Sequence, residues 1–557
     1  MANTRRNFLQ KLGFGTTALG LTTAIPLSSS AAHSDNKKPD EEGQVLFIGE
    51  NIAIANTQYG KVRGFILRGI HTYLGIPYGA DTSGENRFMP PKKPASWTDI
   101  KPAIWWGNSA PQNMENRYAN PYSSFIDHWN YDDVSEDCLR INVWTPALND
   151  GKKRPVVVWL HGGGFVNGNG IEQDGYNGEN LTRRGDVVFC SLNHRLGPMG
   201  FANFAAMGGE KYAASGNVGM LDIVVALEWV KNNISNFGGD PGNVTIIGQS
   251  GGGVKVSTLT AMPSAKGLFH KAVVLSGASL RASDKEVSEK LGAYILQEAG
   301  LMATQVDKLQ QLPWKEYLDI ASRASKKLSD EMRAQGKRGG GWSPVADGKY
   351  LPQHPYDPAP TPLAADIPMI ICTTFNEASP SRTDASLETI TLDGVKEKLK
   401  ERFGEDAGKV ADAYAKAFPE KKPVEIWSMA ISNRQNAVAL ANAKSKQQAP
   451  VYLAWFGWQP PLFDNRMRAF HCSDICFWFY NTDLMLTHTG GGARPRKLSE
   501  KMADSFLKFV RTGNPNGGGL PTWPKYSSQN GETMILDDTP VVKNDPDRSA
   551  RTALPVV

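Results

Sequence analysis

Short runs of apolar residues recur along the chain without the alternation of polar and apolar positions that a half-exposed strand shows. They occupy residues 155–160, 186–192, 243–248, 272–277, 367–374 and 450–458. Runs of this kind are typical of strands that are buried on both faces. Residues 221–236 instead place apolar side chains on two stripes of a helix, which predicts a helix buried over most of its circumference. Strands that alternate with helices predict an α/β fold with a mostly parallel central sheet flanked by helices.

The segment that precedes these runs follows a different pattern. Between residues 51 and 67, apolar positions alternate on both sides of Tyr59 and Gly60. This alternation predicts an antiparallel meander at the N-terminal edge of the fold. No internal repeat and no linker rich in Pro, Gly or Ser interrupts the chain after residue 45. We therefore expect residues 46–557 to form a single domain with long insertions.

Residues 1–32 have the layout of an export signal. Arg5 and Arg6 precede a mildly apolar run and then a stretch of small residues, and acidic residues are absent. The stretch TRRNFL resembles the twin-arginine signal that carries folded proteins across the bacterial inner membrane. We expect export to the periplasm or beyond the cell; the alternatives are a basic N-terminus that arose by chance and a retained anchor. Residues 33–45 are expected to be a polar, disordered linker.

Charge and cysteine content exclude several classes of protein. The formal net charge is only +5 over 557 residues, with basic and acidic side chains intermixed. Nucleic-acid-binding domains usually carry a clustered basic surface, so we expect no nucleic-acid partner. The five cysteines are too few for a disulfide scaffold and lack the spacing of a zinc site, so we expect no metal. Behind the signal, no further segment has the length and apolar content of a membrane span.

Ser250 stands in the sequence GQSGG, between the run at 243–248 and a helical pattern. A serine on a sharp turn between a strand and a helix is the arrangement of a nucleophile elbow. Gly248 and Gly252 would avoid collisions in so tight a turn. A phosphate-binding loop would need a lysine followed by Ser or Thr directly after the glycines, whereas Val254 follows here.

A serine nucleophile also needs backbone donors for the oxyanion and a base that removes its proton. The sequence HGGGF at 161–165 follows a strand directly, so its unhindered N–H groups can face a substrate oxygen. Among the nine histidines, His471 lies in a loop beyond the last predicted strand, and His488 is the alternative.

The acid that orients such a histidine should stand just past a strand of the sheet. Glu377 lies a few residues beyond the run at 367–374. Asp366 precedes that run and so lies at its opposite end, while Asp384 is farther along the chain. Order and position therefore favour Glu377.

Several motifs spread over residues 50–530 resemble the type-B carboxylesterases, which include the cholinesterases and bacterial para-nitrobenzyl esterases. They are YLGIPYG (73–79), RFMPP (87–91), SEDCLRINVWTP (135–146), HGGGF (161–165), NHRLGPMGF (193–201), the stretch 216–253, SPVADGKYLP (343–352), TGNPN (512–516) and WPKY (523–526). The resemblance implies the α/β-hydrolase fold and a catalytic triad of Ser250, Glu377 and His471.

The resemblance also implies an oxyanion hole formed by the amides of Gly163, Gly164 and Gly251. The family usually has Ala after the nucleophile, so Gly251 keeps the donor but is expected to loosen the elbow. Many members bridge the cysteine that corresponds to Cys138 to one shortly upstream. Ala110 stands at that upstream position here, so Cys138 is expected to be free.

The function implied by the resemblance is hydrolysis of a carboxylic ester through an acyl-enzyme, without a cofactor. The family's site lies at the bottom of a gorge lined by insertions, here near 100–135, 300–345 and 465–495. Candidate gorge residues are Phe165, Trp105, Trp106, Trp342, Phe477 and Trp478. The expected partner is a small, partly aromatic ester, and the oligomeric state stays open. A serine amidase or transacylase would use the same residues, and a non-catalytic binding protein on the same fold is a further alternative.

Overall fold

The computed structural model describes residues 43–113, 125, 133–337 and 339–555. Residues 45–557 form one compact unit. The predicted export signal (1–32) and nearly all of the predicted linker (33–45) lie outside the described residues. Across the described part, no single helix is both long and apolar enough to cross a membrane. One bent pair of helical segments, Ala205–Tyr212 with Ser215–Phe237, has the length and the apolar composition of a membrane span when the two are taken together.

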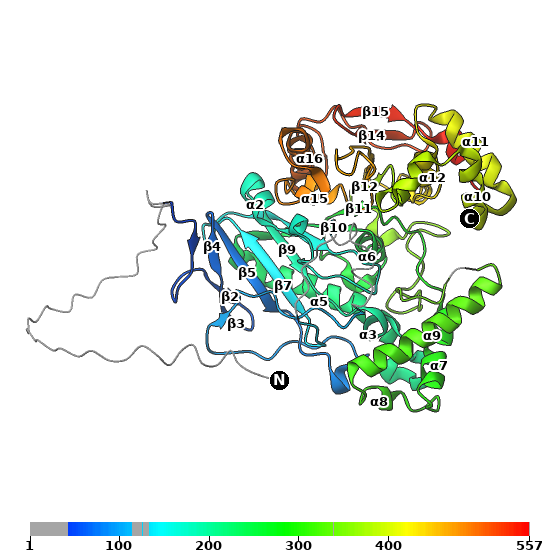
Figure 1. The fold of residues 1–557 in the computed structure, drawn as a ribbon. Coiled ribbons are helices and arrows are strands. Elements are labelled where there is room, and N and C mark those ends of the chain that lie inside the picture. The colour runs from blue at the N-terminus through cyan, green and yellow to red at the C-terminus, as the bar shows by residue number, and fades with distance from the viewer. Residues whose placement is uncertain (1–42, 114–124, 126–132, 338, 556–557) are drawn as a thin grey trace, which may run out of the picture. The chain divides into compact units, whose positions relative to one another are not determined.

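A 12-stranded sheet forms the centre of this unit (Figure 1). Its strands follow the spatial order β1 (Leu46–Phe47), β4 (Phe65–Leu67), β5 (Ile70–Pro77), β7 (Arg140–Thr145), β9 (Val188–Leu192), β8 (Arg154–Leu160), β10 (Gly239–Gln249), β11 (Lys271–Leu275), β12 (Met369–Thr374), β13 (Val451–Phe456), β14 (Glu532–Leu536) and β15 (Val541–Asn544). The strands from β9 to β14 in this order run parallel, and the pairings outside them are antiparallel. The predicted mostly parallel sheet is confirmed.

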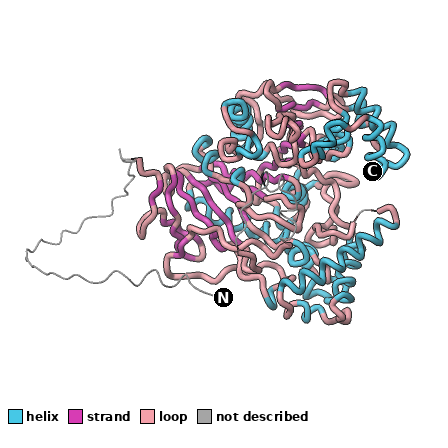
Figure 2. The backbone as a smooth tube through the Cα atoms, viewed as in Figure 1, coloured by secondary structure: helices cyan, strands magenta, loops and turns pink. Residues whose placement is uncertain are grey.

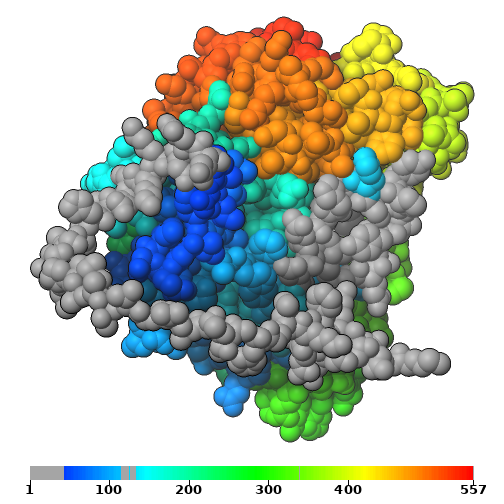
Figure 3. Space-filling model, turned by 60° about the vertical axis from the view of Figure 1, so that its left-hand side comes forward, coloured from blue at the N-terminus to red at the C-terminus, as the bar shows by residue number. Residues whose placement is uncertain are grey.

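The N-terminal meander is divided between two sheets. β2 (Ile54–Thr57) and β3 (Gly60–Arg63) form the hairpin predicted around Tyr59 and Gly60, with Thr57 opposite Gly60. This hairpin pairs with β6 (Lys101–Pro102) in a separate three-stranded sheet, whereas β1, β4 and β5 extend the main sheet. Figure 3 shows that the N-terminal strands, in blue, share one face of the molecule with C-terminal segments in orange.

Helices cover both faces of the sheet (Figure 2). The helices of the described residues are α2 (Glu179–Gly185), α3 (Gly197–Phe201), α4 (Ala205–Gly208), α5 (Val218–Asn233), α6 (Gly251–Leu259), α7 (Lys285–Glu298), α8 (Val306–Leu309), α9 (Trp314–Ala334), α10 (Leu392–Phe403), α11 (Ala407–Ala417), α12 (Pro423–Ala430), α13 (Arg434–Lys444), α14 (Ile475–Trp478), α15 (Leu486–Thr489), α16 (Ala493–Thr512) and α17 (Arg548–Arg551). Of these, α7, α8 and α9 pack in a core cluster of their own that contains no strand residue. The helix expected at 221–236 is α5, and most of its side chains are buried as predicted.

Residues that alternate along the central strands divide the core into two layers. On β8, Val156 and Val158 pack with side chains of α5, α6 and α13. Val157 and Trp159 point to the other face and pack with side chains of α2, α14 and α16. Because both faces are covered, the central strands need apolar residues at every position, which explains the unbroken apolar runs.

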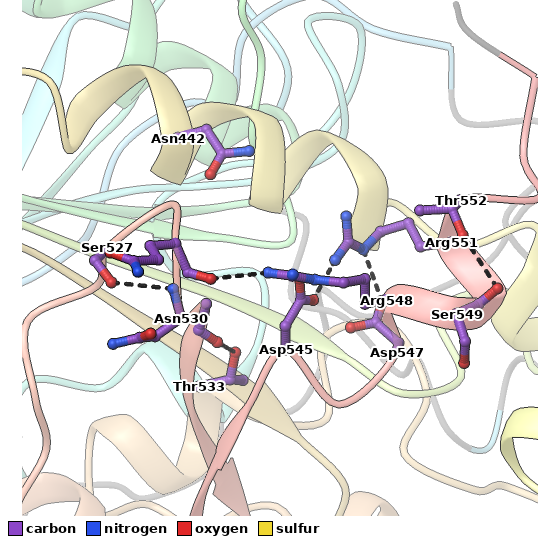
Figure 4. Close-up of polar contacts among 12 residues, drawn as sticks. Asn442, Ser527, Asn530, Thr533, Asp545, Asp547, Arg548, Ser549, Arg551 and Thr552 are labelled. Carbon is purple, nitrogen blue, oxygen red and sulfur yellow. Dashed lines mark hydrogen bonds and ion pairs between the residues drawn. The ribbon is translucent and has the colours of Figure 1, made fainter.

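A polar network fixes the last two strands and the last helix to the body of the unit (Figure 4). Asp547 has no exposed surface and accepts hydrogen bonds from Arg434 of α13 at 3.2 Å and from Arg551 of α17 at 3.2 Å. Asp545, at the end of β15, accepts from Arg548 at 2.6 Å and also pairs with Arg551. Removing one partner of such a buried ion pair strongly lowers the stability of the fold, because a charge is left buried without compensation.

None of the five cysteines, all of which lie in the described ranges, forms a disulfide. Cys138 is buried at the end of the segment before β7, and burial raises the pKa of its thiol. The expected absence of a bridge to position 110 agrees with this arrangement. Cys472 and Cys476 lie close in sequence but are not bridged either.

Candidate active site

Ser250 lies on the sharp turn between β10 and α6. β10 ends at Gln249 and α6 begins at Gly251, and Ser250 between them has φ 56° and ψ −125°, a conformation that non-glycine residues rarely adopt. A Cβ atom on Gly248 would lie 2.4 Å from the carbonyl carbon of Gly252, and one on Gly252 would lie 2.0 Å from Leu160 O. Both glycines are therefore required for the turn, as the sequence pattern predicts.

The glycine turn that follows β8 faces the same elbow. Gly163 and Gly164 have φ values of 75° and 61°. Across the described ranges, the backbone amides of Gly163, Gly164 and Gly251 donate no hydrogen bond to another backbone group. Gly251 is also the first residue of α6, where the helix dipole favours negative charge. These amides are thus available to an anionic oxygen.

Gly251 does not loosen the elbow, contrary to the expectation from its lack of a side chain. A Cβ atom at this position would lie 2.0 Å from Gly164 O and 2.5 Å from Gly164 Cα. A Cβ on Gly253 would lie 2.9 Å from Gly277 Cα. The backbone of neighbouring loops fills the space that a side chain would take, so the glycines bring the two loops closer together.

Glu377 and His471 form a hydrogen-bonded pair. His471 Nδ1 lies 2.5 Å from Glu377 Oε2, and the other carboxylate oxygen of Glu377 accepts the amide of Thr374 at 2.9 Å. The Glu377 side chain is 7% exposed, whereas His471 keeps 33% of its side-chain surface open. An acid that is buried and held at both oxygens can orient a partly open imidazole.

The loops that carry this acid and base are joined through their main chains. The amide of Asn376, next to Glu377, donates to Ala469 O at 3.0 Å. Asn376 and Phe470 form an isolated parallel bridge directly before His471. The loop after β12 and the loop after β13 thus hold their functional side chains in a fixed register.

The second ring nitrogen of His471, Nε2, contacts the side chain of Gln249. Gln249 Nε2 lies 3.1 Å from His471 Nε2, and its Oε1 accepts from Cys472 Sγ at 3.3 Å. When His471 is neutral and its proton lies on Nδ1, facing Glu377, its Nε2 accepts the hydrogen bond from Gln249. Within the described part, no hydrogen bond joins Ser250 Oγ to His471, whose Nε2 contacts Gln249.

The pKa of His471 is raised well above its ordinary value. Burial alone would lower this pKa, but the charges of Cys472 and Glu377 and their hydrogen bonds outweigh it. Asp474, with no exposed surface, lies near this pair, and burial raises its pKa to about 6. Although these groups are close together, the described residues contain no set of three or more His, Cys, Asp or Glu side chains arranged to hold a metal ion.

The alternatives for the acid and the base lie elsewhere. Asp366 is exposed ahead of β12, as expected. Asp384 is an exposed helix cap that accepts the amide of Ser386 at 3.0 Å. His488 is buried on α15 with its ring edge-on to Phe470. The geometry therefore brings together Glu377 and His471 and none of these three.

The candidate gorge aromatics do not gather at one place. Phe165 is buried beside the glycine turn, and Trp105 is 47% exposed. Trp106 lines a cavity of about 220 Å³ between β4, β5, β7 and the segment 171–179, and the lining residues include none of the triad. Phe477 and Trp478 have no exposed surface and pack in the core, so they cannot line an open gorge in this conformation. Trp342 packs between two core clusters.

Gln249 and Asp474 are site residues that the sequence reasoning missed. Gln249 is the first of the two variable positions of the GQSGG motif, and Asp474 is the one acid inside the apolar stretch after His471. A polar residue in such a position is a signal, but only the fold shows what it contacts.

Comparison with known proteins agrees with the geometry. The family model described as "Carboxylesterase family" matches residues 51–553. The para-nitrobenzyl esterase of Bacillus subtilis (strain 168) is 36% identical, over 90% of this chain and 98% of that protein. The phenmedipham hydrolase of Pseudarthrobacter oxydans is 31% identical, over 87% of this chain and 95% of that protein.

A solved structure resembles the chain over nearly its whole length. It is an esterase from the anaerobe Clostridium hathewayi that can hydrolyse aliphatic aromatic polyesters, 33% identical with a TM-score of 0.78, and the match covers 91% of this chain and 99% of that one. Such identity and coverage carry both the fold and the reaction class. The chain therefore belongs to the carboxylesterase family, as a carboxylic ester hydrolase with the α/β-hydrolase fold.

Proposed function

We propose that this protein hydrolyses carboxylic esters through a covalent acyl-enzyme, with Ser250 as nucleophile, His471 as base and Glu377 as the orienting acid. The observation that carries the proposal is the 2.5 Å contact between His471 and Glu377, placed next to the strained turn at Ser250. A hydroxyl is a weak nucleophile until a base with a fixed orientation accepts its proton.

The reaction has two steps that use the same groups. His471 accepts the proton of Ser250 as Oγ attacks the ester carbonyl, and the alcohol leaves with the proton returned by His471. Water then attacks the acyl-enzyme by the same route and releases the carboxylic acid. In each step the oxyanion is received by the amides of Gly163, Gly164 and Gly251, which carry no other backbone hydrogen bond across the described ranges.

Purified protein is expected to turn over p-nitrophenyl esters and to be labelled by an organophosphonate probe. The panel should include alkyl and aryl esters, short aromatic polyester fragments and amides of matched acyl groups. Esters should be hydrolysed and amides far more slowly, because an amine is the poorer leaving group. Faster turnover of the amides would assign an amidase instead, and a protein inert toward both the esters and the probe would contradict the proposal.

Replacing Glu377 by glutamine should lower kcat/KM by about 10²- to 10⁴-fold and move its rising limb to lower pH. The charge of Glu377 is one of the groups that raise the pKa of His471. Without that charge His471 loses its proton at lower pH, so the rate reaches its plateau earlier. The measurement is kcat/KM as a function of pH.

Asp384→Asn is the matched control for this substitution, because Asp384 is an exposed carboxylate in the same connection after β12. It should leave both the rate and the pH profile unchanged. An unaltered profile in Glu377→Gln would remove Glu377 from the triad.

A further inference from the structure

Lys255 is a buried charge directly behind the glycine turn. It lies on α6, one residue beyond the first turn after Ser250, and has no exposed surface. Its Nζ donates a hydrogen bond to the main-chain oxygen of His161 at 2.9 Å. Burying an ammonium group with so few partners is costly, and an apolar side chain of similar volume would be at least as stable here.

Lys255 contacts both ends of the glycine turn. His161 immediately precedes Gly162–Gly164, and its carbonyl accepts the Lys255 hydrogen bond. Phe165 immediately follows them, and the centroid of its ring lies 5.6 Å from Lys255 Nζ, within the range of a cation–π contact.

The turn itself offers no side chain that could fix its conformation. Gly162, Gly163 and Gly164 have the wide backbone freedom of glycine, and a Cβ on Gly251 would lie 2.0 Å from Gly164 O, so α6 approaches the turn through its backbone. A catalytic group held about 1 Å from its productive position can lose roughly a hundredfold in rate. A side chain that spans the turn from its first flanking residue to its last would limit such displacement.

Among the described basic groups near the glycine turn, Lys255 is the one that can carry a positive charge toward it, because the neighbouring histidines are neutral and the neighbouring arginine is paired with an acid. The rings of His161 and His194 stack with centroids 5.1 Å apart, and burial followed by the charge of Lys255 lowers both pKa values well below the ordinary one. The nearby Glu172 raises the pKa of Lys255, but burial is the larger effect and lowers it to about 7. Arg195, beyond His194, is paired with Asp222.

We propose that Lys255 is a positioning residue for the oxyanion hole. Its ammonium group holds the His161 and Phe165 ends of the glycine turn against α6, and it places a positive charge behind the amides that receive the oxyanion. The proposal rests on the function proposed for Ser250. Because charge develops on the substrate oxygen in the transition state, the contribution of Lys255 falls on kcat and little on KM.

Lys255→Met in the full chain is the test, and Lys444→Met is its matched control. Lys444 is a second lysine without exposed surface that donates to a main-chain carbonyl, Ala364 O at 2.6 Å, but it lies on α13. We expect Lys255→Met to lower kcat for a p-nitrophenyl ester about 10- to 100-fold with little change in KM, and Lys444→Met to change neither. The melting temperature of Lys255→Met should not fall below that of the wild type.

A transition-state analogue separates positioning from a purely structural role. The inhibition constant of a trifluoromethyl ketone should rise in Lys255→Met by the same factor by which kcat/KM falls. The rate advantage of the wild type over Lys255→Met should be largest below about pH 7, where Lys255 is protonated, and should shrink above it. Lys255→Gln keeps an N–H donor without the charge, so it should recover part of the rate and lack this pH-dependent advantage.

Wild-type values of kcat and of analogue affinity in Lys255→Met would overturn the proposal while the proposed function of Ser250 stands. Should Lys255→Met fail to fold, wild-type kcat and pH dependence in Lys255→Gln would overturn it equally. A wild-type protein that is inert toward esters and organophosphonates would instead refute the proposed function.

Discussion

Replacing Ser250 by alanine is expected to reduce ester turnover by about five to six orders of magnitude. In the proposed mechanism this hydroxyl attacks the substrate carbonyl beside the amides of the glycine turn, and the alanine variant has no group that replaces it. The small remaining rate would come from substrate binding and from the oxyanion donors acting on water. Single-turnover and steady-state assays with p-nitrophenyl esters measure the loss, and organophosphonate labelling should disappear with it.

Ser257→Ala supplies the matched control for this experiment. Ser257 lies on the same helix, is buried, and donates to Gly253 O at 3.1 Å, so its replacement alters the same element without touching the elbow. The Ser257 variant should retain activity and labelling. A Ser250→Ala protein that keeps more than about a hundredth of the wild-type rate would mean that another residue is the nucleophile.

Replacing Asp222 by alanine should lower the free energy of unfolding by about 3–5 kcal/mol. Asp222 of α5 and Arg195, in the loop after β9, are 0% and 1% exposed. The carboxylate accepts Arg195 Nε at 2.8 Å, Nη2 at 2.6 Å and the Arg195 amide at 3.0 Å. Without the acid, a guanidinium group remains buried with one carbonyl partner, Met89 O.

Asp504→Asn is the comparison that isolates the effect of burial. Asp504 also binds an arginine, Arg184, with two hydrogen bonds of 2.7 and 2.8 Å, but this pair lies at the surface. Its loss should cost only about 0–1 kcal/mol. Denaturant titration of each variant measures the difference, and equal losses from the two substitutions would show that the buried pair contributes no more than a surface one.

The sequence predicts well those elements whose burial leaves a simple pattern. β8 to β13 appear as unbroken apolar runs because both faces of these strands are covered. Ser250 and Glu377 could be selected because each follows a strand of the sheet directly or after two residues, and His471 because it is one of few histidines and lies in the longer loop beyond β13. The carboxyl ends of parallel strands lie along the same edge of the sheet, so residues that follow different strands come close together there. Glu377 and His471 are such residues, and they lie 2.5 Å apart.

Contacts between side chains of distant segments could not be predicted in this way. Phe477 and Trp478 look like gorge residues in sequence because aromatic residues suit both a binding site and a core, and only the fold shows that they are fully buried. From the sequence alone, a glycine at position 251 suggests a flexible turn. In the structure, the backbone of Gly164 fills the space that a side chain at position 251 would take. Nothing in the sequence around Lys255 indicates that its side chain binds the main-chain carbonyl of His161.

The main-chain bridge between Asn376 and Phe470 makes the acid and the base a transplantable unit. Protein engineers who exchange segments among esterases should take residues 374–377 and 469–472 from the same parent, because the loops that follow β12 and β13 are joined at this bridge. Chimeras with a crossover between these two short segments would combine Glu377 from one parent with His471 from the other, so the bridge that sets their spacing would join two different backbones.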